Sequence, residues 1–356
     1  MASRQALAED HGVTTMTMQG LFFTGTGRLE WREAFMPRLE GPGEALVRPL
    51  AVAACDLDLG IVQGKSPFSP PFMLGHEFAG EIVEVGEDVC GFALGDRVAV
   101  AFQPSCGGCE PCRRGHSATC SVASGTPMYG IGEAGGNWGG ALADVVRVPY
   151  AGAMMVPLPE GVSPAMAAGA SDNVADGYRA VADALQGRPG ASVLVAGSGS
   201  IPLYAAWWAR TLGAGDVTLC SRDPALLERA ARFGVAVDLV KSWPRRFRTH
   251  AITVDCTGDP AGLAAVVRST EAYGRCTSAS IYFGGDTPMP MFDMNMKGIR
   301  FETGRVNGST LLPEVLSLIA QHGLTPETVD ATVVRWEEMD AAMLEGAFRP
   351  IAVHCV

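Results

Sequence analysis

Between residues 192 and 280, short apolar segments alternate with alanine-rich segments that favour helix, and this alternation constrains the fold more than any other feature of the chain. Strands that are separated by helices run in one direction, because each helix carries the chain back to the start of the next strand. The pattern predicts a parallel, doubly wound sheet and hence an α/β fold. The expected strands cover 192–196, 216–220, 251–255 and 275–280, and the expected helices cover 202–212, 224–233 and 260–269.

The first third of the chain has a different texture, with short β-like runs that are broken by glycine and proline. Such regularly spaced strands, here at 45–52, 81–85, 96–100 and 139–149, favour a small antiparallel, barrel-like domain. The segment after about residue 305 has a helix at 312–322 and a terminal strand at 351–356 but no strand–helix repeat. We therefore expect two domains, with this last segment packing back onto the first.

The charge and the N-terminal sequence exclude several classes of partner. A net charge of -11 argues against nucleic acid or an anionic membrane as the main partner. No segment has the apolar length of a membrane span or the apolar core of a signal peptide, and residues 1–17 are expected to form a flexible extension. Without a secretion signal, clustered cysteines indicate metal ligation in a reducing cytoplasm rather than disulfides.

Four cysteines are clustered within 15 positions, in a stretch that glycine and proline shape into turns. Four thiolates at this spacing suit a closed tetrahedral site, which predicts a structural Zn²⁺ in a lobe over about 104–122. An iron–sulfur cluster or free thiols are the alternatives, although the spacing matches neither ferredoxin pattern closely. The four candidate ligands are Cys106, Cys109, Cys112 and Cys120.

A second metal site is suggested by Cys55, His76 and Glu77, because a catalytic zinc takes three or four such ligands and keeps one position open or exchangeable. Taken singly, each residue has a plainer interpretation. Cys55 could be a small buried hydrophobic residue, and His76 a core histidine. The residue types alone leave these alternatives open.

The combination of motifs resembles the zinc-dependent medium-chain dehydrogenase/reductase superfamily, of which alcohol dehydrogenases are the best-known members. The resemblance runs from about residue 20 to the end of the chain. It implies a GroES-like catalytic domain at 18–172, a Rossmann domain at 173–304 and a return to the catalytic domain at 305–356. The motifs that carry it are Cys55-x-x-Asp58, Gly75-His76-Glu77-x-x-Gly80-x5-Gly86 and the four-cysteine cluster.

The resemblance also assigns roles to individual residues. It implies Asp172 as the third ligand of a catalytic zinc, six residues before Tyr178, as in the bacterial NADP-dependent secondary-alcohol branch. Glu77 would be a fourth, exchangeable ligand, and Asp58 would orient His76 through its second ring nitrogen. The family implies two zinc ions per chain, a small-molecule substrate and a homodimer or homotetramer.

A glycine turn follows the first predicted strand of the second domain and precedes a helix, which is where a dinucleotide pyrophosphate binds to backbone N–H groups. The turn residues are Gly197, Gly199, Ser200 and Ile201, and Pro202 takes the place of the third glycine of the usual fingerprint. The resemblance further places Thr257 beneath the nicotinamide and residues 281–284 close to its ring.

The residues after the second strand bear on the choice of cofactor. Ser221 stands where NAD-binding proteins place an acid, and Arg222 follows it. A hydroxyl and a guanidinium suit a 2′-phosphate, which favours NADP(H) over NAD(H). In a register shifted by two residues, Asp223 would accept from the ribose and favour NAD(H).

The chain departs from the family beside the ligand cysteine. The family commonly has Ser or Thr two residues after it as the first member of a proton relay, whereas this chain has Leu57, which cannot transfer a proton. Asp56 would repel a pyrophosphate if it pointed toward one. The favoured function is hydride transfer between NADP(H) and an alcohol or carbonyl compound. The alternatives are an NADPH-dependent C=N or C=C reductase and a non-catalytic nucleotide-binding protein.

The substrate pocket is expected from loops around 56–73, 125–138 and 282–296. These loops contain large apolar side chains that could line it, namely Phe68, Phe72, Trp138, Tyr282, Met289 and Met291.

Overall fold

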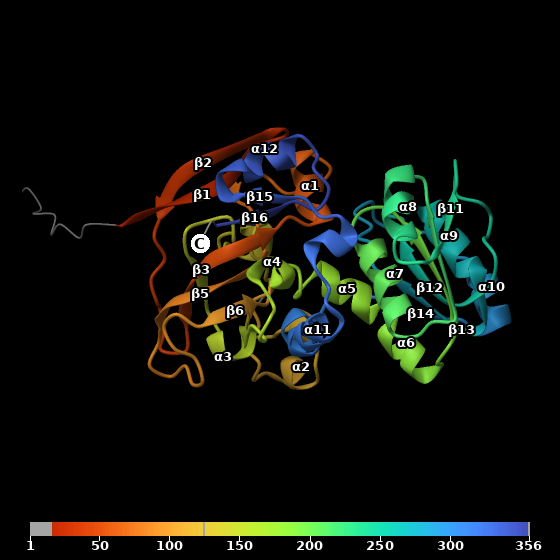
Figure 1. Cartoon of the computed structure of the whole chain (residues 1–356), viewed down its shortest axis with the longest axis horizontal. Helices are drawn as coiled ribbons and strands as arrows, with labels where there is room; N and C mark the ends of the chain where they lie inside the picture. The colour runs from red at the N-terminus through yellow and green to blue at the C-terminus, as the bar shows by residue number, and fades with distance from the viewer. Residues whose placement is uncertain (1–15, 124, 355–356) are drawn as a thin grey trace, which may run out of the picture.

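The computed structural model describes residues 16–123 and 125–354. Most of the extension predicted for residues 1–17 lies outside these ranges. Figure 1 shows two domains side by side, a β-rich domain built from both ends of the chain and a sheet-and-helix domain built from its middle. In this described part, no helix is both long and apolar enough to cross a membrane.

The β-rich domain has two sheets. Its seven-stranded sheet has the order β15-β16-β3-β5-β6-β8, with β7 paired to β3, and its three-stranded sheet has the order β2-β1-β4. Strand β16 pairs antiparallel with β3, which confirms that the last segment returns to the first domain. The strands are β1 (Thr17–Gly25), β2 (Arg28–Phe35), β3 (Ala45–Ala53), β4 (Phe72–Met73), β5 (Glu77–Val85), β6 (Arg97–Val100), β7 (Val146–Val148), β8 (Met155–Pro157), β15 (Val333–Arg335) and β16 (Ile351–Val353).

The pairing of β3 with β5 positions the His-Glu motif at the start of β5. Every residue of β3 except Arg48 is buried, as expected for a central strand. Gly80 lies opposite Pro49, and a Cβ at position 80 would stand 2.4 Å from the carbonyl oxygen of Arg48. Only glycine allows this close approach of the two backbones.

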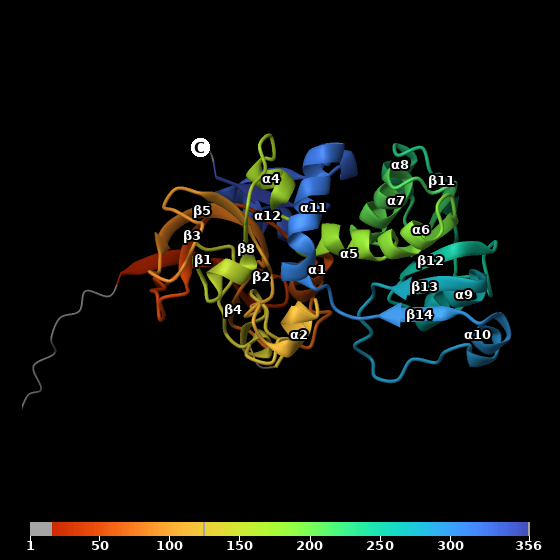
Figure 2. The same ribbon diagram turned by 90° about the horizontal axis from the view of Figure 1, so that it is seen from below.

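The middle domain confirms the predicted doubly wound sheet. Its six strands are all parallel, in the order β11-β10-β9-β12-β13-β14. Helices α7 and α8 lie on one side of this sheet, and α9 and α10 lie on the other (Figure 2). The elements are β9 (Ser192–Gly197), α7 (Ile201–Thr211), β10 (Asp216–Ser221), α8 (Pro224–Ala231), β11 (Ala236–Leu239), β12 (His250–Cys256), α9 (Pro260–Ser269), β13 (Thr270–Ser278), α10 (Met291–Lys297) and β14 (Arg300–Thr303).

Shorter helices connect the strands and the two domains. Helix α5 packs against α7 across the domain boundary, and α11 packs against α5 and the cysteine lobe. These helices are α1 (Asp56–Val62), α2 (Glu110–Arg113), α3 (Ala151–Met154), α4 (Pro164–Ala167), α5 (Asn173–Arg179), α6 (Ala182–Gly187), α11 (Gly308–His322) and α12 (Met339–Leu344).

The structure differs from the sequence prediction in several elements. The strand expected at 139–149 is reduced to β7, because residues 141 and 142 instead donate to the carbonyls of Gly75 and Leu74 without a regular ladder. Strand β11 and helix α10 were not predicted. Neither has a buried residue, so neither shows the apolar periodicity that indicates an element.

Candidate active site

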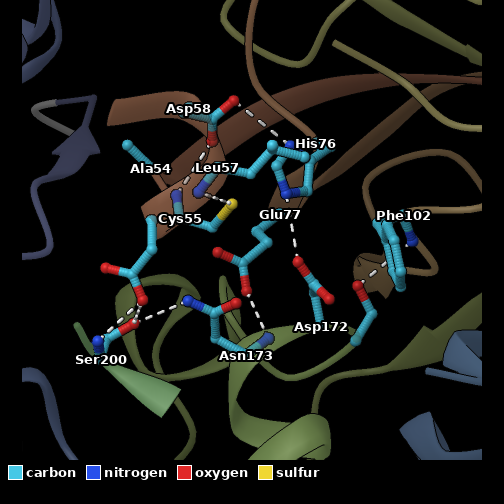
Figure 3. A network of polar contacts seen from close by, with 12 residues as sticks. Ala54, Cys55, Leu57, Asp58, His76, Glu77, Phe102, Asp172, Asn173 and Ser200 are labelled. Atoms are coloured by element: carbon cyan, nitrogen blue, oxygen red, sulfur yellow. Dashed lines mark hydrogen bonds and ion pairs between the residues drawn. The ribbon is translucent and has the colours of Figure 1, made fainter. Parts of the chain in front are cut away.

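Three potential metal ligands from distant parts of the chain converge at the domain boundary. Cys55 precedes α1, His76 precedes β5 and Asp172 precedes α5. One ligand atom from each lies within 4.8 Å of the other two. The Nε2 atom of His76 is 3.2 Å from Oδ2 of Asp172, and Figure 3 shows both side chains and the Cys55 sulfur facing one another. The structure thus brings together the three ligands that the family resemblance implied.

The ends of two helices fix these ligands. Cys55 is the N-cap of α1: its sulfur accepts from the N–H of Leu57 at 3.1 Å, and its own N–H donates to Asp58 at 2.9 Å. Asp172 is the N-cap of α5, but its carboxylate accepts no hydrogen bond from that helix. An N-cap aspartate commonly accepts from the first turn. Here the carboxylate is left free for the cluster.

Asp58 approaches His76 from the side opposite Asp172. The Nδ1 atom of His76 is 3.4 Å from Oδ1 of Asp58, and both side chains are buried. This is an ion-pair distance without good hydrogen-bond geometry, so both atoms lack a hydrogen-bond partner. Burial alone would lower the pKa of His76, but Asp58 and Cys55 together raise it well above its ordinary value. Asp58 therefore stands where it can hold a proton on Nδ1 and leave Nε2 free for a metal.

The cluster has the chemistry of a zinc site. Burial raises the pKa of the Cys55 thiol to about 12, although His76 opposes this shift. A thiol this weak ionises at neutral pH only if a cation stabilises the thiolate. One sulfur, one imidazole nitrogen and one carboxylate are ligands that Zn²⁺ accepts in a three-ligand site with an open position. The residues present fit the metal.

Glu77 is not brought into the cluster. Its carboxylate pairs with the guanidinium of Arg349 and accepts from the backbone N–H of Asn173 at 2.9 Å. Burial raises the pKa of Glu77, and the charge of Arg349 opposes the rise. The exchangeable ligand that the resemblance implied is thus held away from the three ligands by an arginine 272 positions along the chain.

The four lobe cysteines also converge, with one sulfur from each lying within 4.8 Å of the others. Backbone N–H groups point at the sulfurs: Cys106 donates to Cys120 and Cys109 to Cys106, both at 3.3 Å. Hydrogen bonds from the Cys112 backbone and from Ser121 lower the pKa of the Cys109 thiol to about 5, whereas burial raises the pKa of the Cys112 thiol to about 12. Backbone donors that stabilise thiolates in a tight group of four fit a closed structural zinc site.

The glycine turn lies between β9 and α7, as predicted. A Cβ at Gly197 would stand 2.1 Å from the carbonyl oxygen of Cys256, so neighbouring strands touch there. Gly199 has a φ of +86°, which favours glycine. The Asp56 carboxylate does point toward this turn: its Oδ2 accepts from the Ser200 N–H at 2.8 Å and from the Ser200 hydroxyl at 3.2 Å.

The residues predicted to choose the cofactor lie at the end of β10. The buried Ser221 hydroxyl accepts from the Asp223 N–H at 3.0 Å. Asp223 in turn caps α8, where it accepts from the Ala225 N–H at 2.9 Å. The guanidinium carbon of Arg222 lies 4.8 Å from the centre of the Trp243 ring, and half of the arginine side chain is exposed. The cation at this strand end is therefore Arg222, which already lies 3.6 Å from the Asp259 carboxylate, while the Asp223 carboxylate caps α8.

A single cavity of about 510 Å³ connects the metal cluster with the glycine turn. Cys55 and Asp172 line it near the cluster, and Ser198 and Ile201 line it at the turn. Thr257, whose hydroxyl donates to the buried Asp255 at 2.6 Å, also lines it. Ser221 and Arg222 lie outside this lining.

The apolar wall of the cavity differs from the one predicted. It is formed by Phe102, Met128, Ile281 and Phe283, and none of the six apolar residues suggested by the sequence lines it. Phe72 is buried in the core, and Met291 is exposed at the far edge of the middle domain. Loop membership alone could not tell which apolar side chains face inward.

Sequence reasoning missed two residues that hold the site together. The Asn173 side chain donates to Ser200 at 2.7 Å while its backbone N–H donates to Glu77, so it links the catalytic domain to the glycine turn. Arg349 pairs with Glu77 and donates to the carbonyl of Ala54 at 2.8 Å. Asn173 could have been found from its place next to Asp172. No pattern near position 349 marks that arginine.

Comparison with known proteins identifies the family. A family model described as the alcohol dehydrogenase GroES-like domain matches residues 41–160. The glutathione-independent formaldehyde dehydrogenase of Pseudomonas aeruginosa is 32% identical over 266 residues, which are 69% of this chain and 66% of that relative. The zinc-type alcohol dehydrogenase B of Aspergillus flavus is 26% identical over 329 residues, covering 87% of this chain and 74% of that protein.

A solved structure agrees over nearly the whole length. The alcohol dehydrogenase of Thermus sp. ATN1 superposes with a TM-score of 0.88 and 30% sequence identity, covering 95% of this chain and 100% of that one. The match includes both domains and the order in which the chain builds them. The chain belongs to the zinc-dependent medium-chain alcohol dehydrogenase superfamily.

Proposed function

We propose that the protein is a zinc-dependent oxidoreductase that transfers hydride between NADP(H) and an alcohol or carbonyl compound. The observation that carries this proposal is the continuity of the cavity, which is lined at one end by two of the three clustered ligands and at the other by the glycine turn. A substrate oxygen near the cluster and a nicotinamide above Thr257 would share one cavity. Such proximity favours direct hydride transfer.

The chain's own residues prepare both ends of this space. When bound, zinc on Cys55, His76 and Asp172 supplies Lewis-acid polarisation of the substrate oxygen, and the nicotinamide supplies or accepts the hydride. Asp58 keeps the His76 proton on Nδ1. The buried Phe102, whose ring lies 5.8 Å from that of His76, excludes water beside the cluster.

The preference for NADP(H) rests on the end of β10. Arg222 is half exposed and lies 3.6 Å from the Asp259 carboxylate. A 2′-phosphate at this strand end would compete with that carboxylate for the guanidinium, whose fork of donors can bind a phosphate bidentately. Asp223, the residue that would accept from an unphosphorylated ribose, is used as a helix cap. The charge and the geometry at this strand end both support NADP(H).

The names of the relatives support carbonyl and alcohol chemistry. Those named for formaldehyde are two glutathione-independent dehydrogenases and a dismutase, and others are named for alcohols or for L-threonine. We infer a small alcohol or aldehyde as the substrate class. Reduction of a C=N or C=C bond is the second candidate, and Leu57 favours it because this side chain lines the cavity and cannot relay a proton.

Metal analysis and a substrate screen test the proposal together. We expect two zinc ions per chain in the wild type and one in Cys55→Ala. Two ions with NADPH-dependent turnover of an alcohol or aldehyde would support the proposal. A single ion held by the cysteine lobe would contradict the catalytic zinc. NADPH binding without turnover on any carbonyl, imine or enone would instead favour a non-catalytic protein.

Substitution at Leu57 distinguishes the two chemistries. Leu57→Ser places a hydroxyl in the cavity and is expected to raise the rate of alcohol oxidation by about 10² or more if proton transfer limits the reaction. Leu59→Ser, on the same helix but outside the cavity lining, is the matched control. Good imine or enone reduction by the wild type, with no gain in alcohol oxidation for Leu57→Ser, would favour the second candidate.

We further propose a homo-oligomer in a reducing, cytoplasmic compartment. Strand β14 is an unpaired edge of the parallel sheet, and the adjacent α10 exposes Met291, Phe292 and Met296. Exposed edges and apolar patches of this kind are usually covered by a partner. All nine described cysteines are free, which suits a reducing compartment.

A further inference from the structure

The Asp56 carboxylate spans the boundary between the two domains. Asp56 is the first residue of α1 in the catalytic domain, whereas the Ser200 N–H and hydroxyl that donate to it lie at the start of α7 in the Rossmann domain. The contact is tight. A Cβ at Gly199 would stand 2.4 Å from the Asp56 carboxylate.

This position is where a dinucleotide places its pyrophosphate. The N-terminus of a helix after a glycine turn offers free backbone N–H groups and a positive dipole end, and in parallel α/β sheets these bind the pyrophosphate. Helix α7 has 11 residues and follows β9 directly through that turn. The Ser200 N–H is one of its free donors, and Asp56 already occupies it.

The Asp56 carboxylate and a pyrophosphate cannot both bind at the start of α7. Both are anionic, and like charges in direct contact are strongly unfavourable. The cation that acts on Asp56 is Arg349, whose guanidinium is already paired with Glu77. The side chain has room to leave, because Asp56 lines the 510 Å³ cavity.

We propose that Asp56 is a determinant of cofactor affinity: its carboxylate occupies the pyrophosphate-binding position at the start of α7, and the cofactor binds by displacing it. This inference rests on the proposed dinucleotide-dependent function. It gives the residue beside the ligand cysteine a role of its own. In the free protein, the contact of Asp56 with Ser200 joins α1 to α7 across the domain boundary. When the cofactor binds, its pyrophosphate replaces the Asp56 carboxylate in this contact.

Binding measurements on the zinc-loaded protein test the displacement. Dissociation constants would be determined by calorimetry for NADPH, ADP-ribose and adenosine 2′-monophosphate, of which the last has no pyrophosphate. We expect Asp56→Asn and Asp56→Ser to bind NADPH and ADP-ribose at least about tenfold more tightly than the wild type, since both remove the charge repulsion and Asp56→Ser also removes the long acceptor side chain that reaches Ser200. Affinity for adenosine 2′-monophosphate should not change.

Asp183→Asn is the matched control, because it removes the same charge from an exposed side chain of α6. It should leave all three affinities unchanged. Amide hydrogen exchange supplies an independent readout: the Ser200 N–H should exchange faster in Asp56→Ser than in the wild type, and ADP-ribose should protect it in both. This measurement also shows whether each variant is folded.

The outcomes separate this inference from the proposed function. Equal or weaker binding of ADP-ribose by both Asp56 variants would overturn the inference, as would equal tightening for adenosine 2′-monophosphate. Wild-type turnover with NADPH would leave the proposed function standing in that case. Tighter pyrophosphate binding by the variants without turnover of any substrate would support the inference and sink the function instead.

Discussion

At the scale of single residues, the candidate site depends on where protons and charges are held. Asp58 uses one carboxylate oxygen to cap α1 through the Cys55 N–H and directs the other toward the His76 ring. One side chain therefore aligns two of the three ligands. A substitution of Asp58 that kept the shape of the side chain but replaced this oxygen with an N–H donor would move the imidazole proton from Nδ1 to Nε2.

We predict that Asp58→Asn loses zinc from the catalytic cluster. An asparagine amide can donate to Nδ1 of His76, which would move the imidazole proton to Nε2 and block the atom that faces Asp172. Disruption of such outer contacts commonly weakens metal affinity by about 10–100-fold. Competition with a chromophoric chelator measures the loss, and the lobe zinc is the internal control. Unchanged affinity for both ions would show that Asp58 does not set the tautomer.

At the scale of elements, the two domains are joined where α5 meets α7. Gly177 of α5 lies so close to α7 that a Cβ there would stand 2.6 Å from the Cβ of Tyr204 and 2.7 Å from the backbone nitrogen of Ala205. Trp208 of α7 also donates to the carbonyl of Val174 in α5 at 3.1 Å. This pair of helices carries Asp172 at one end and the glycine turn at the other, so its packing fixes the distance between them.

We predict that Gly177→Ala destabilises the protein by about 1–3 kcal/mol, because the added methyl group would clash with the backbone of α7, which must then shift. Gly187→Ala is a matched control: it is also a helical glycine, but a Cβ there meets nothing within 4 Å. The control should stay within about 0.5 kcal/mol of the wild type, because Gly187 is the last residue of α6 and the new methyl group meets no neighbour. Chemical denaturation of both variants measures the difference, and equal effects of the two changes would contradict the close approach.

Most strands and helices of the middle domain were predictable from sequence, whereas its exposed elements β11 and α10 were not. Helix α9 was predicted with its observed bounds, because its apolar residues face the sheet. The candidate metal ligands that the structure brings together were predicted from motif spacing and from the family resemblance. Arg349 has no such signal, because its partner Glu77 is brought to it only when β16 pairs with β3. The contact of Asp56 with Ser200 likewise depends on how two domains meet.

At the scale of the whole molecule, stability depends on buried groups that cannot ionise freely. His250 begins β12 and is buried, with Nδ1 at 2.8 Å from the Arg248 carbonyl and Nε2 without a partner. Burial lowers the pKa of His250 below its ordinary value, although the Arg248 carbonyl and Asp216 oppose the shift. The folded protein therefore resists a proton that the unfolded chain accepts.

We predict that this histidine destabilises the fold in acid. Because its folded pKa lies below its unfolded pKa of about 6.5, its contribution is fully present above that pH and is lost as the pH falls below it. Urea denaturation at about pH 7.5 and pH 5.5 should show a smaller loss for His250→Leu than for the wild type. The exposed His322→Gln should behave like the wild type. A loss for His250→Leu as large as that of the wild type would exclude this histidine as the source.

The catalytic domain is built from two separated segments of the chain, and this arrangement also dictates an order of assembly. Central strand β3 lacks its neighbour β16 until some 300 further residues have been made, and the cysteine lobe lacks Asn307, which accepts from Ala118 at 3.1 Å. The six-stranded parallel sheet needs no residue from outside 192–303. During synthesis, the Rossmann domain can fold first and then bring the two separated parts of its neighbour together. The zinc lobe would thus gain its full support late, as one of the last regions of the chain to mature.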